Sequence, residues 1–156
     1  MNRFSRFDKY KLKMEIGIGN DHTGVKYKNK IIEFLKTKNY DIVNFGTDSE
    51  ESVDYPDYVH PVSNFVEKKI NNIGILICGS ANGVAMTANK HRKIRAALCW
   101  NREITKLSRQ HNNANIICIP ARFVSVDDAI KMVEIFIATE FEGGRHNKRV
   151  NKIPCD

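Results

Sequence analysis

The stretch Asn72-Ile73-Gly74-Ile75-Leu76-Ile77-Cys78-Gly79-Ser80-Ala81-Asn82-Gly83 decides the fold of this chain. Five of the six residues at 73–78 are apolar, which predicts a strand that is buried on both faces. Strands of this kind belong to parallel sheets that helices cover on both sides. The stretch therefore favours an α/β fold.

The turn at residues 79–83 is the first candidate functional element. A helix is predicted to follow it at residues 84–90, so its backbone N–H groups would face a ligand above the sheet, and an anion suits them. Cys78 lies at the mouth of the turn, where a helix N-terminus lowers the pKa of a thiol from about 8.5. Two interpretations of Cys78 remain open at this point. It is either a base beside an anion cradle or a small apolar core residue.

Four further segments are predicted to be strands, and they alternate with segments of helical periodicity. The strands are expected at residues 15–19, 41–45, 95–99 and 115–119, and the other helices at residues 25–35, 58–69, 101–112 and 127–137. Pro61 is expected in the first turn of its helix, and Asp127 is expected to cap the last helix.

Five alternating strands predict a three-layer, doubly wound sandwich of the Rossmann or flavodoxin-like kind, with a parallel sheet in the order 2-1-3-4-5. In this order the first and third strands are neighbours. The turn that carries Asp21 and His22 would then meet the turn that begins at Cys78, at the switch point where such folds bind ligands.

Length and composition are those of an ordinary globular protein. The 156 residues are enough for one domain with a full core, and 42% of them are hydrophobic and 28% charged. The formal net charge is +7, but residues 1–13 hold five Lys or Arg against one Asp, a local +4, which leaves +3 for the rest. So small a surplus suits a protein that handles small anions, and we expect no nucleic-acid partner.

The two ends of the chain differ in character. Residues 1–13 are predicted to be a basic, disordered extension, and residues 14–156 a single domain. No apolar run approaches the roughly 20 residues of a membrane span, and the N-terminus lacks the apolar core of a signal peptide. We therefore expect no membrane partner and a cytoplasmic location. Neither a zinc site nor a disulfide framework is indicated by the spacing of the cysteines, which are Cys78, Cys99, Cys118 and Cys155.

Two further segments carry candidate functional residues. His111 is predicted at the C-terminal end of a helix, where the dipole favours protonated imidazole, and it either takes part in chemistry or caps the helix. Arg145 and Arg149 would repel each other on a bare helix, whereas a phosphate between them would accept charge-assisted hydrogen bonds. The alternative for these arginines is a solvated basic tail.

Several motifs occur together in one order: Asn20-Asp21-His22-Thr23-Gly24, Ser52-Val53-Asp54-Tyr55-Pro56-Asp57-Tyr58, Ile75-Leu76-Ile77-Cys78-Gly79, Ala88-Asn89-Lys90, Ile94-Arg95-Ala96-Ala97-Leu98-Cys99, Arg109-Gln110-His111-Asn112 and Thr139-Glu140-Phe141-Glu142-Gly143-Gly144-Arg145-His146. They resemble the motifs of the type B ribose-5-phosphate isomerases, which belong to a broader family that includes allose- and galactose-phosphate isomerases. The resemblance runs from about Met14 to Ile153.

The resemblance implies a reversible isomerisation of ribose 5-phosphate to ribulose 5-phosphate, a step of the pentose phosphate pathway, through an enediolate and without a metal or an organic cofactor. Cys78 would be the catalytic base, and Ser80 would help to shuttle the hydroxyl proton. His111, together with Asp21, would open the furanose ring. The residues implied to bind substrate are Asp21, His22, Gly79, Ser80, Ala81, Asn82, Gly83, Asn112, Arg122, Arg145 and Arg149. The resemblance also implies homodimers, or dimers of dimers, in which each site is built from two chains.

Some positions depart from the family pattern. The turn reads Gly-Ser-Ala-Asn-Gly where many relatives have Gly-Thr-Gly-x-Gly, so Ala81 and Asn82 would narrow or re-aim the cradle, and Trp100 follows the fourth strand near where side chains limit substrate length. An isomerase of a six-carbon sugar phosphate, such as allose 6-phosphate, is therefore one alternative. Another keeps the fold without the chemistry, as a phosphate- or nucleotide-binding module. Cys78 and His111 favour the enzyme, because a pure binder does not need them.

Overall fold

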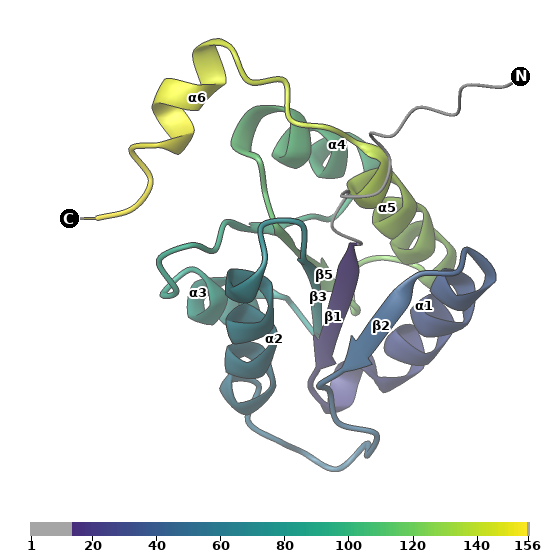
Figure 1. The fold of residues 1–156 in the computed structure, drawn as a ribbon. Helices are drawn as coiled ribbons and strands as arrows, with labels where there is room; N and C mark the ends of the chain where they lie inside the picture. The colour runs from purple at the N-terminus through teal and green to yellow at the C-terminus, as the bar shows by residue number, and fades with distance from the viewer. Residues whose placement is uncertain (1–13, 156) are drawn as a thin grey trace, which may run out of the picture.

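The sheet is organised around β3 (Ile73–Cys78), which is buried at every position. In the computed structural model, which describes residues 14–155, this strand is the middle one of five and pairs in parallel with β1 (Glu15–Asn20) and β5 (Ile116–Pro120) (Figure 1). The predicted parallel α/β sheet with a buried central strand is confirmed. The extension expected at residues 1–13 lies outside the described residues.

The order of the strands is β2-β1-β3-β5-β4, so the predicted order 2-1-3-4-5 is wrong for the last two strands. The cause is a difference in apolar content, because β4 (Ala96–Leu98) is three residues long and half-buried, whereas β5 is buried throughout. A longer apolar strand gains more from being covered on both faces, so β5 takes the place beside β3. The short β4 and the largely exposed β2 (Asp41–Asn44) form the edges. The neighbouring positions of β1 and β3 are as predicted.

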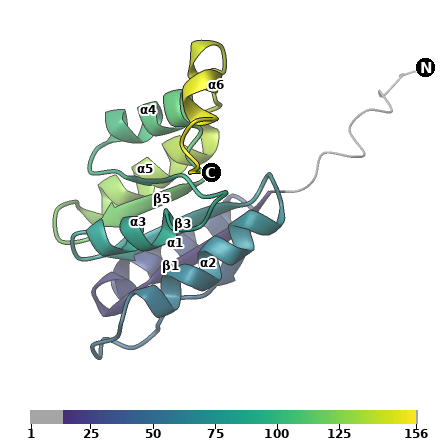
Figure 2. The same cartoon turned by 90° about the vertical axis from the view of Figure 1, so that its left-hand side faces the viewer.

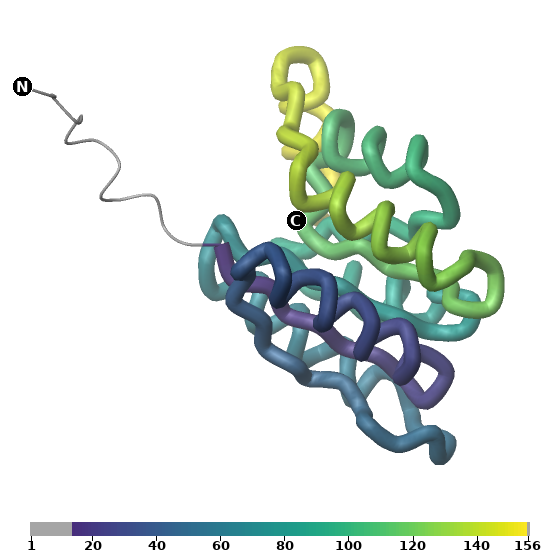
Figure 3. Tube along the Cα trace, turned by 90° about the vertical axis from the view of Figure 1, so that its right-hand side faces the viewer, coloured from purple at the N-terminus to yellow at the C-terminus, as the bar shows by residue number. Residues whose placement is uncertain are grey.

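Helices cover both faces of the sheet and form the expected three layers. On one face lie α2 (Pro56–Lys68) and α3 (Asn82–Ala88), on the side of the sheet that faces the viewer in Figure 2. On the other face lie α1 (Val25–Thr37) and α5 (Val126–Ala138), side by side in Figure 3, with α4 (Arg102–Asn112) against α5. Each face of the sheet has its own apolar cluster of buried side chains. Among residues 14–155, no helix has the length and apolar character needed to cross a membrane.

The helix α3 begins at Asn82, two residues before the prediction, and two other helix starts differ in a way that involves a proline or a cap. The helix α2 begins at Pro56, so Pro61 lies in its second turn, where its missing N–H leaves the carbonyl of the exposed Asp57 without the usual partner. Ser125, and not Asp127, caps α5, because its Oγ accepts a hydrogen bond from N of Asp128 at 3.1 Å. The same Oγ also donates to the Asp128 carboxylate at 3.0 Å, so Ser125 and Asp128 hold each other at the start of the helix.

Two short helical segments complete the fold. The 3-10 turn η2 (His22–Gly24) follows β1 after one residue, Asp21, which caps it. The helix α6 (Arg145–Val150) contacts α4 and carries Arg145 and Arg149. In Figure 1 the arrowheads of β1 and β2 point to the bottom of the view, whereas α6 lies at the top. We call the end of the sheet at which its strands finish the carboxyl edge. The opposite end, at which the strands begin, is called the amino edge.

Lys28 on α1 is fully buried, which is unusual for a lysine. Its Nζ donates a hydrogen bond to the backbone oxygen of Thr47 at 2.6 Å and forms an ion pair with Asp48. The ion pair holds the pKa of the Asp48 carboxyl below its usual value. These contacts hold the segment after β2 against α1. They add to the apolar packing that is expected of the Lys28 side-chain stem from its position in the helix.

Candidate functional site

Cys78 and Asp21 meet at the carboxyl edge of the sheet. In the register of β1 with β3, Asn20 lies opposite Ile77, so the residues that follow them stand at the same level. The Sγ atom of Cys78 donates to Oδ2 of Asp21 at 3.0 Å. Oδ1 of Asp21 accepts from N and Oγ1 of Thr23, at 2.9 and 2.5 Å, which fixes the carboxylate. The predicted meeting of the two turns is confirmed.

The Cys78 thiol is mostly protonated at neutral pH in this chain. Burial raises its pKa to about 11, and the hydrogen bond to Asp21 and the negative charge of Asp21 raise it as well. The N–H groups of Ala81 and Gly79 lower the pKa, but by less. The expectation of a lowered thiol pKa is therefore wrong for the single chain, because burial and a neighbouring carboxylate outweigh the helix N-terminus.

The turn at residues 79–83 has at Ala81 a backbone conformation that is typical of glycine. Ala81 has φ 62° and ψ 1°, in the left-handed region that glycine enters most easily, and its side chain is fully buried. Ser80 and Asn82 are exposed on either side of it. Alanine at this position thus adopts the left-handed backbone directly, at a conformational cost of about 1 kcal/mol.

Tyr55, which sequence reasoning does not single out as a site residue, lies against the turn. A Cβ atom added to Gly83 would stand 2.4 Å from Cζ of Tyr55, so the ring rests on the backbone of the glycine. The close approach of α2 to the sheet allows this, since a Cβ added to Gly19 would be 2.8 Å from the backbone oxygen of Tyr58. Tyr55 is 37% exposed. Its place in the motif at residues 52–58 is the sequence signal that could have identified it as a site residue.

His22 and Arg122 also lie at the carboxyl edge, and Arg122 contacts the turn. Nδ1 of His22 accepts a hydrogen bond from N of Val53 at 3.3 Å. Arg122 follows β5, its backbone N donates to the oxygen of Gly79 at 3.1 Å, and its Nε would be 3.2 Å from a Cβ added to Gly79. The carboxyl edge therefore gathers a thiol, a carboxylate, an imidazole and a guanidinium around one turn. We call Asp21, His22, Cys78 to Gly83 and Arg122 the carboxyl-edge group.

The other predicted site residues lie at the amino edge. His111 and Asn112 end α4, and the chain then enters β5 at Ile116, opposite Gly74 of β3. Gly74 and Cys78 are four residues apart on β3, a rise of roughly 13 Å. Arg145 and Arg149 lie on α6, at the same end as His111 (Figure 1). One chain therefore does not bring these residues to Cys78, and we call His111, Asn112, Arg145 and Arg149 the amino-edge group.

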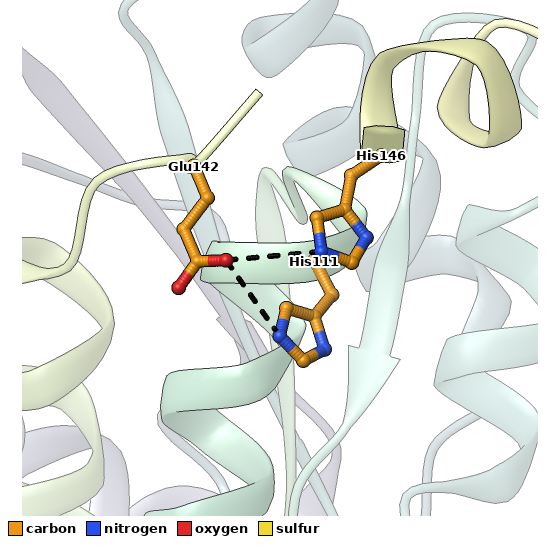
Figure 4. A group of neighbouring side chains, drawn as sticks. All are labelled: His111, Glu142 and His146. Carbon is orange, nitrogen blue, oxygen red and sulfur yellow. Dashed lines mark ion pairs between the residues drawn. The ribbon is translucent and has the colours of Figure 1, made fainter. Parts of the chain in front are cut away.

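His111 has two neighbours that sequence reasoning does not identify, namely Glu142 and His146 (Figure 4). The rings of His111 and His146 stack with centroids 4.3 Å apart and planes at 11°. Oε2 of Glu142 is 3.9 Å from Nε2 of His111 and 3.7 Å from Nε2 of His146. The pKa of His146 is lowered by desolvation and by the positive charges of His111, Arg145 and Arg149, against the opposing effect of Glu142. The motif at residues 139–146 contained both neighbours, but only the tertiary structure places them at His111.

Comparison with known proteins gives the same family over nearly the whole chain. The family model of the ribose/galactose isomerases matches residues 16–153. The chain is 42% identical over 144 residues to a probable ribose-5-phosphate isomerase B of Mycoplasma genitalium, covering 91% of this chain and 95% of that protein. It is 37% identical over 139 residues to ribose-5-phosphate isomerase B of Escherichia coli, covering 89% of this chain and 93% of that protein.

Solved structures agree with the sequence relatives. A crystal structure of ribose-5-phosphate isomerase B from Mycoplasma genitalium with bound ribulose 5-phosphate has a TM-score of 0.87 and 43% identity, covering 90% of this chain and 93% of that one. The ribose 5-phosphate isomerase of Thermotoga maritima has a TM-score of 0.87 and 41% identity, covering 90% and 97% of the two chains. With this fold, and with the matched segment spanning both edge groups, the chain belongs to the ribose/galactose isomerase family.

Proposed function

We propose that this protein is an aldose–ketose isomerase that interconverts ribose 5-phosphate and ribulose 5-phosphate. The observation that carries the proposal is Cys78, a thiol held at 3.0 Å from Asp21 beside a backbone turn. Support comes from relatives named ribose-5-phosphate isomerase B and from the Mycoplasma genitalium structure that holds ribulose 5-phosphate. A phosphate-binding module without chemistry would need the arginines but not the thiol.

The proposed reaction moves one proton between two carbons. In the open-chain aldose, the thiolate of Cys78 takes the proton from C2, and the electrons of the broken C–H bond form the C1=C2 bond of an enediolate. The N–H groups of residues 79–83 face the enediolate oxygen, and Ser80 passes the hydroxyl proton between O2 and O1. Return of the proton from Cys78 to C1 gives the ketose and regenerates the thiolate.

The remaining roles follow the family resemblance. His111 protonates the ring oxygen of the furanose, with Asp21 assisting, and Asn112 binds the sugar. His22, Arg122, Arg145 and Arg149 bind the phosphate, the arginines through charge-assisted hydrogen bonds. Ribose 5-phosphate is preferred over a six-carbon sugar phosphate because the closely similar relatives carry that name. Trp100, which is 54% exposed just beyond β4, is the side chain expected to limit substrate length.

We further propose that the working unit is a homodimer with shared sites, alone or paired into a dimer of dimers. The carboxyl-edge group holds the base and half of the phosphate ligands, whereas the amino-edge group holds the ring-opening histidine and the other half. A two-fold axis that brings the amino edge of one chain to the carboxyl edge of its partner completes two identical sites at once.

The cytoplasm is the proposed compartment. All four cysteines are free thiols, and Cys78, Cys99 and Cys118 are buried. Free thiols persist where the surroundings are reducing.

A complementation experiment tests function and assembly together. Cys78→Ser and His111→Asn should each be inactive on ribose 5-phosphate, because each lacks one necessary group. After subunit exchange at equal concentrations, half of the dimers are hybrids with one intact site of two, so about a quarter of the wild-type turnover should return. A mixture that stays inactive although hybrids are detected by mass would contradict the shared site. An inactive wild-type protein in the coupled assay would contradict the proposed function itself.

A further inference from the structure

Glu142 points one carboxylate oxygen at both His111 and His146 (Figure 4). The ligand atoms of the three side chains all lie within 4.8 Å of one another. Within residues 14–155, no other three His, Cys, Asp or Glu side chains come together in this way. The isomerisation proposed above uses His111 alone of the three, which leaves the role of the arrangement open.

We propose that His111, Glu142 and His146 form a binding site for a divalent transition-metal ion, represented by Zn²⁺, and that the bound ion blocks turnover. Two imidazole nitrogens and one carboxylate oxygen are a ligand set that zinc accepts, with the fourth position left to water. Bonds of 2.0–2.1 Å in tetrahedral geometry place neighbouring ligand atoms roughly 3.3 Å apart. The two contacts to Glu142, at 3.9 and 3.7 Å, are therefore already within about 0.6 Å of that spacing.

The local backbone prepares this site. Gly143 and Gly144 have φ of 65° and 54°, which non-glycine residues rarely adopt, and they turn the chain between Glu142 and α6. N of His146 then donates to the oxygen of Gly143 at 3.0 Å, which places Glu142 and His146 on the same side. To bind one ion, the ring of the more exposed His111 has to tilt so that its Nε2 approaches that of His146.

In the single chain an ion can reach the site from solvent, because the side chains of His111 and Glu142 are 37% and 49% exposed, whereas His146 is 8% exposed. In the proposed homodimer His111 faces the substrate, so an ion would enter by the same route as the substrate. Arg145 and Arg149 act against a cation, because their positive charges reach His146. We therefore expect a reversible site whose occupancy follows the free metal concentration, and not a permanently bound cofactor.

The second histidine pair of the described chain provides a matched control. Nδ1 of His60 and Nε2 of His91 are hydrogen-bonded to each other at 2.8 Å, and Nδ1 of His91 contacts Glu67 at 3.3 Å. Both nitrogens of His91 are thus already used, and the three side chains do not offer three ligand atoms to one ion. His91→Gln removes a histidine from a His–His–Glu neighbourhood without touching the proposed site.

The effect on turnover rests on the proposed function of His111. A metal ion occupies the Nε2 lone pair and the carboxylate of Glu142, so His111 can no longer carry a proton to the ring oxygen. Binding can be measured without any activity assay, and failure of the metal site is therefore distinguishable from failure of the proposed isomerase function.

The test is equilibrium dialysis of the metal-free, full-length oligomer against ZnCl₂, followed by titration with Co²⁺ as a spectroscopic probe. We expect one Zn²⁺ per chain and visible Co²⁺ bands of a nitrogen- and oxygen-ligated site without a sulfur charge-transfer band. Glu142→Gln and His146→Gln should each weaken binding about tenfold or more, while His91→Gln and Cys155→Ser should leave it unchanged. Circular dichroism of each variant confirms that it is folded, and Glu142 is exposed enough for its glutamine variant to fold.

Several outcomes decide the proposal. Unchanged Zn²⁺ binding in both Glu142→Gln and His146→Gln would overturn the site, and loss of binding in Cys155→Ser would assign the metal to that exposed thiol instead. In the isomerase assay, inhibition should have the same midpoint as binding, should be reversed by a chelator, and should weaken in Glu142→Gln relative to the uninhibited rate of that variant. Full turnover with the site occupied would overturn the inhibitory half of the proposal.

Discussion

The Sγ atom of Cys78 lies 3.0 Å from Oδ2 of Asp21, so the thiol proposed as base is held as a hydrogen-bond donor to a carboxylate. This contact stabilises the protonated thiol and, with burial, raises the pKa of Cys78 to about 11. At neutral pH the thiol is thus mostly protonated in the single chain. It can act as a base only after it has lost this proton. Each of the following predictions changes one part of this arrangement or of its surroundings.

Asp21→Asn should lower the pKa of the Cys78 thiol, because it removes the negative charge and the acceptor that favour S–H. The amide is close in shape to the carboxylate and can still accept from Thr23. The pKa is measured from the ultraviolet absorbance of the thiolate as the pH is raised, with Cys78→Ser subtracted so that Cys99 and Cys118 do not contribute. An unchanged or higher pKa in Asp21→Asn would contradict the electrostatic account.

In the wild type, kcat/KM should rise with pH through the neutral range, about tenfold per pH unit, until another group limits it.

Cys78→Ala should fold normally and lose isomerisation by a factor of about 10² or more, the size expected for loss of a general base. The measurement is exchange of the C2 proton with solvent deuterium, which reports the base directly. Cys99→Ala is the matched control, because Cys99 is also buried but lies at the end of β4, apart from the turn. Proton exchange at C2 that persists in Cys78→Ala would remove Cys78 from its proposed role.

His111→Asn should slow the turnover of ribose 5-phosphate, whose ring has to open, far more than the turnover of ribulose 5-phosphate, which is already open. The reason is that His111 is proposed to protonate only the ring oxygen. Both directions are followed by coupled assays and corrected for the reaction equilibrium. Equal losses in both directions would mean that His111 serves the isomerisation step or the structure instead.

Arg149→Ala should reduce kcat/KM for the phosphorylated substrate about ten- to a hundredfold, since charge-assisted hydrogen bonds contribute roughly 1.5 to 3 kcal/mol each. Inorganic phosphate should become a weaker competitive inhibitor by a similar factor. Lys148→Ala is the control, as Lys148 is an exposed cation of the same helix α6. If Lys148→Ala costs as much as Arg149→Ala, the effect is one of general charge and not of a specific phosphate ligand.

Lys28→Met should destabilise the protein by roughly 1 to 3 kcal/mol, because the backbone oxygen of Thr47 loses its charged donor and keeps only the Asn20 amide, and Asp48 loses its ion pair. Urea unfolding measures the change. Lys30→Met, which removes the exposed ion pair with Glu33 on the same helix, should change stability by less than about 0.5 kcal/mol. Equal effects of the two substitutions would show that the buried contacts of Lys28 contribute little.

Much of the fold followed from local patterns. The apolar run at residues 73–78 predicted the buried β3, and the helical spacing around Ile31 and Met132 predicted α1 and α5, because each pattern depends on residues that are close in the chain. The meeting of Asp21 with Cys78 followed from the adjacency of the first and third strands. Errors arose where two local signals competed. Ser125 and Asp127 are both acceptable caps, and the hydrogen bonds between Ser125 and Asp128 decide between them.

What the sequence by itself determined is the set of elements and the chemical groups at their ends: a buried parallel strand, a thiol at its last residue, and a turn that we propose to bind anions. Tertiary structure decided the rest, because the remaining properties depend on distances across the fold. Competition for two-sided burial placed β5 beside β3 and moved β4 to the edge. Burial and the carboxylate of Asp21 set the thiol pKa. The antiparallel return of α4 against the sheet carried His111 to the amino edge, beside Glu142 and His146 and away from Cys78, since a helix that starts at the carboxyl end of its strand must finish at the other.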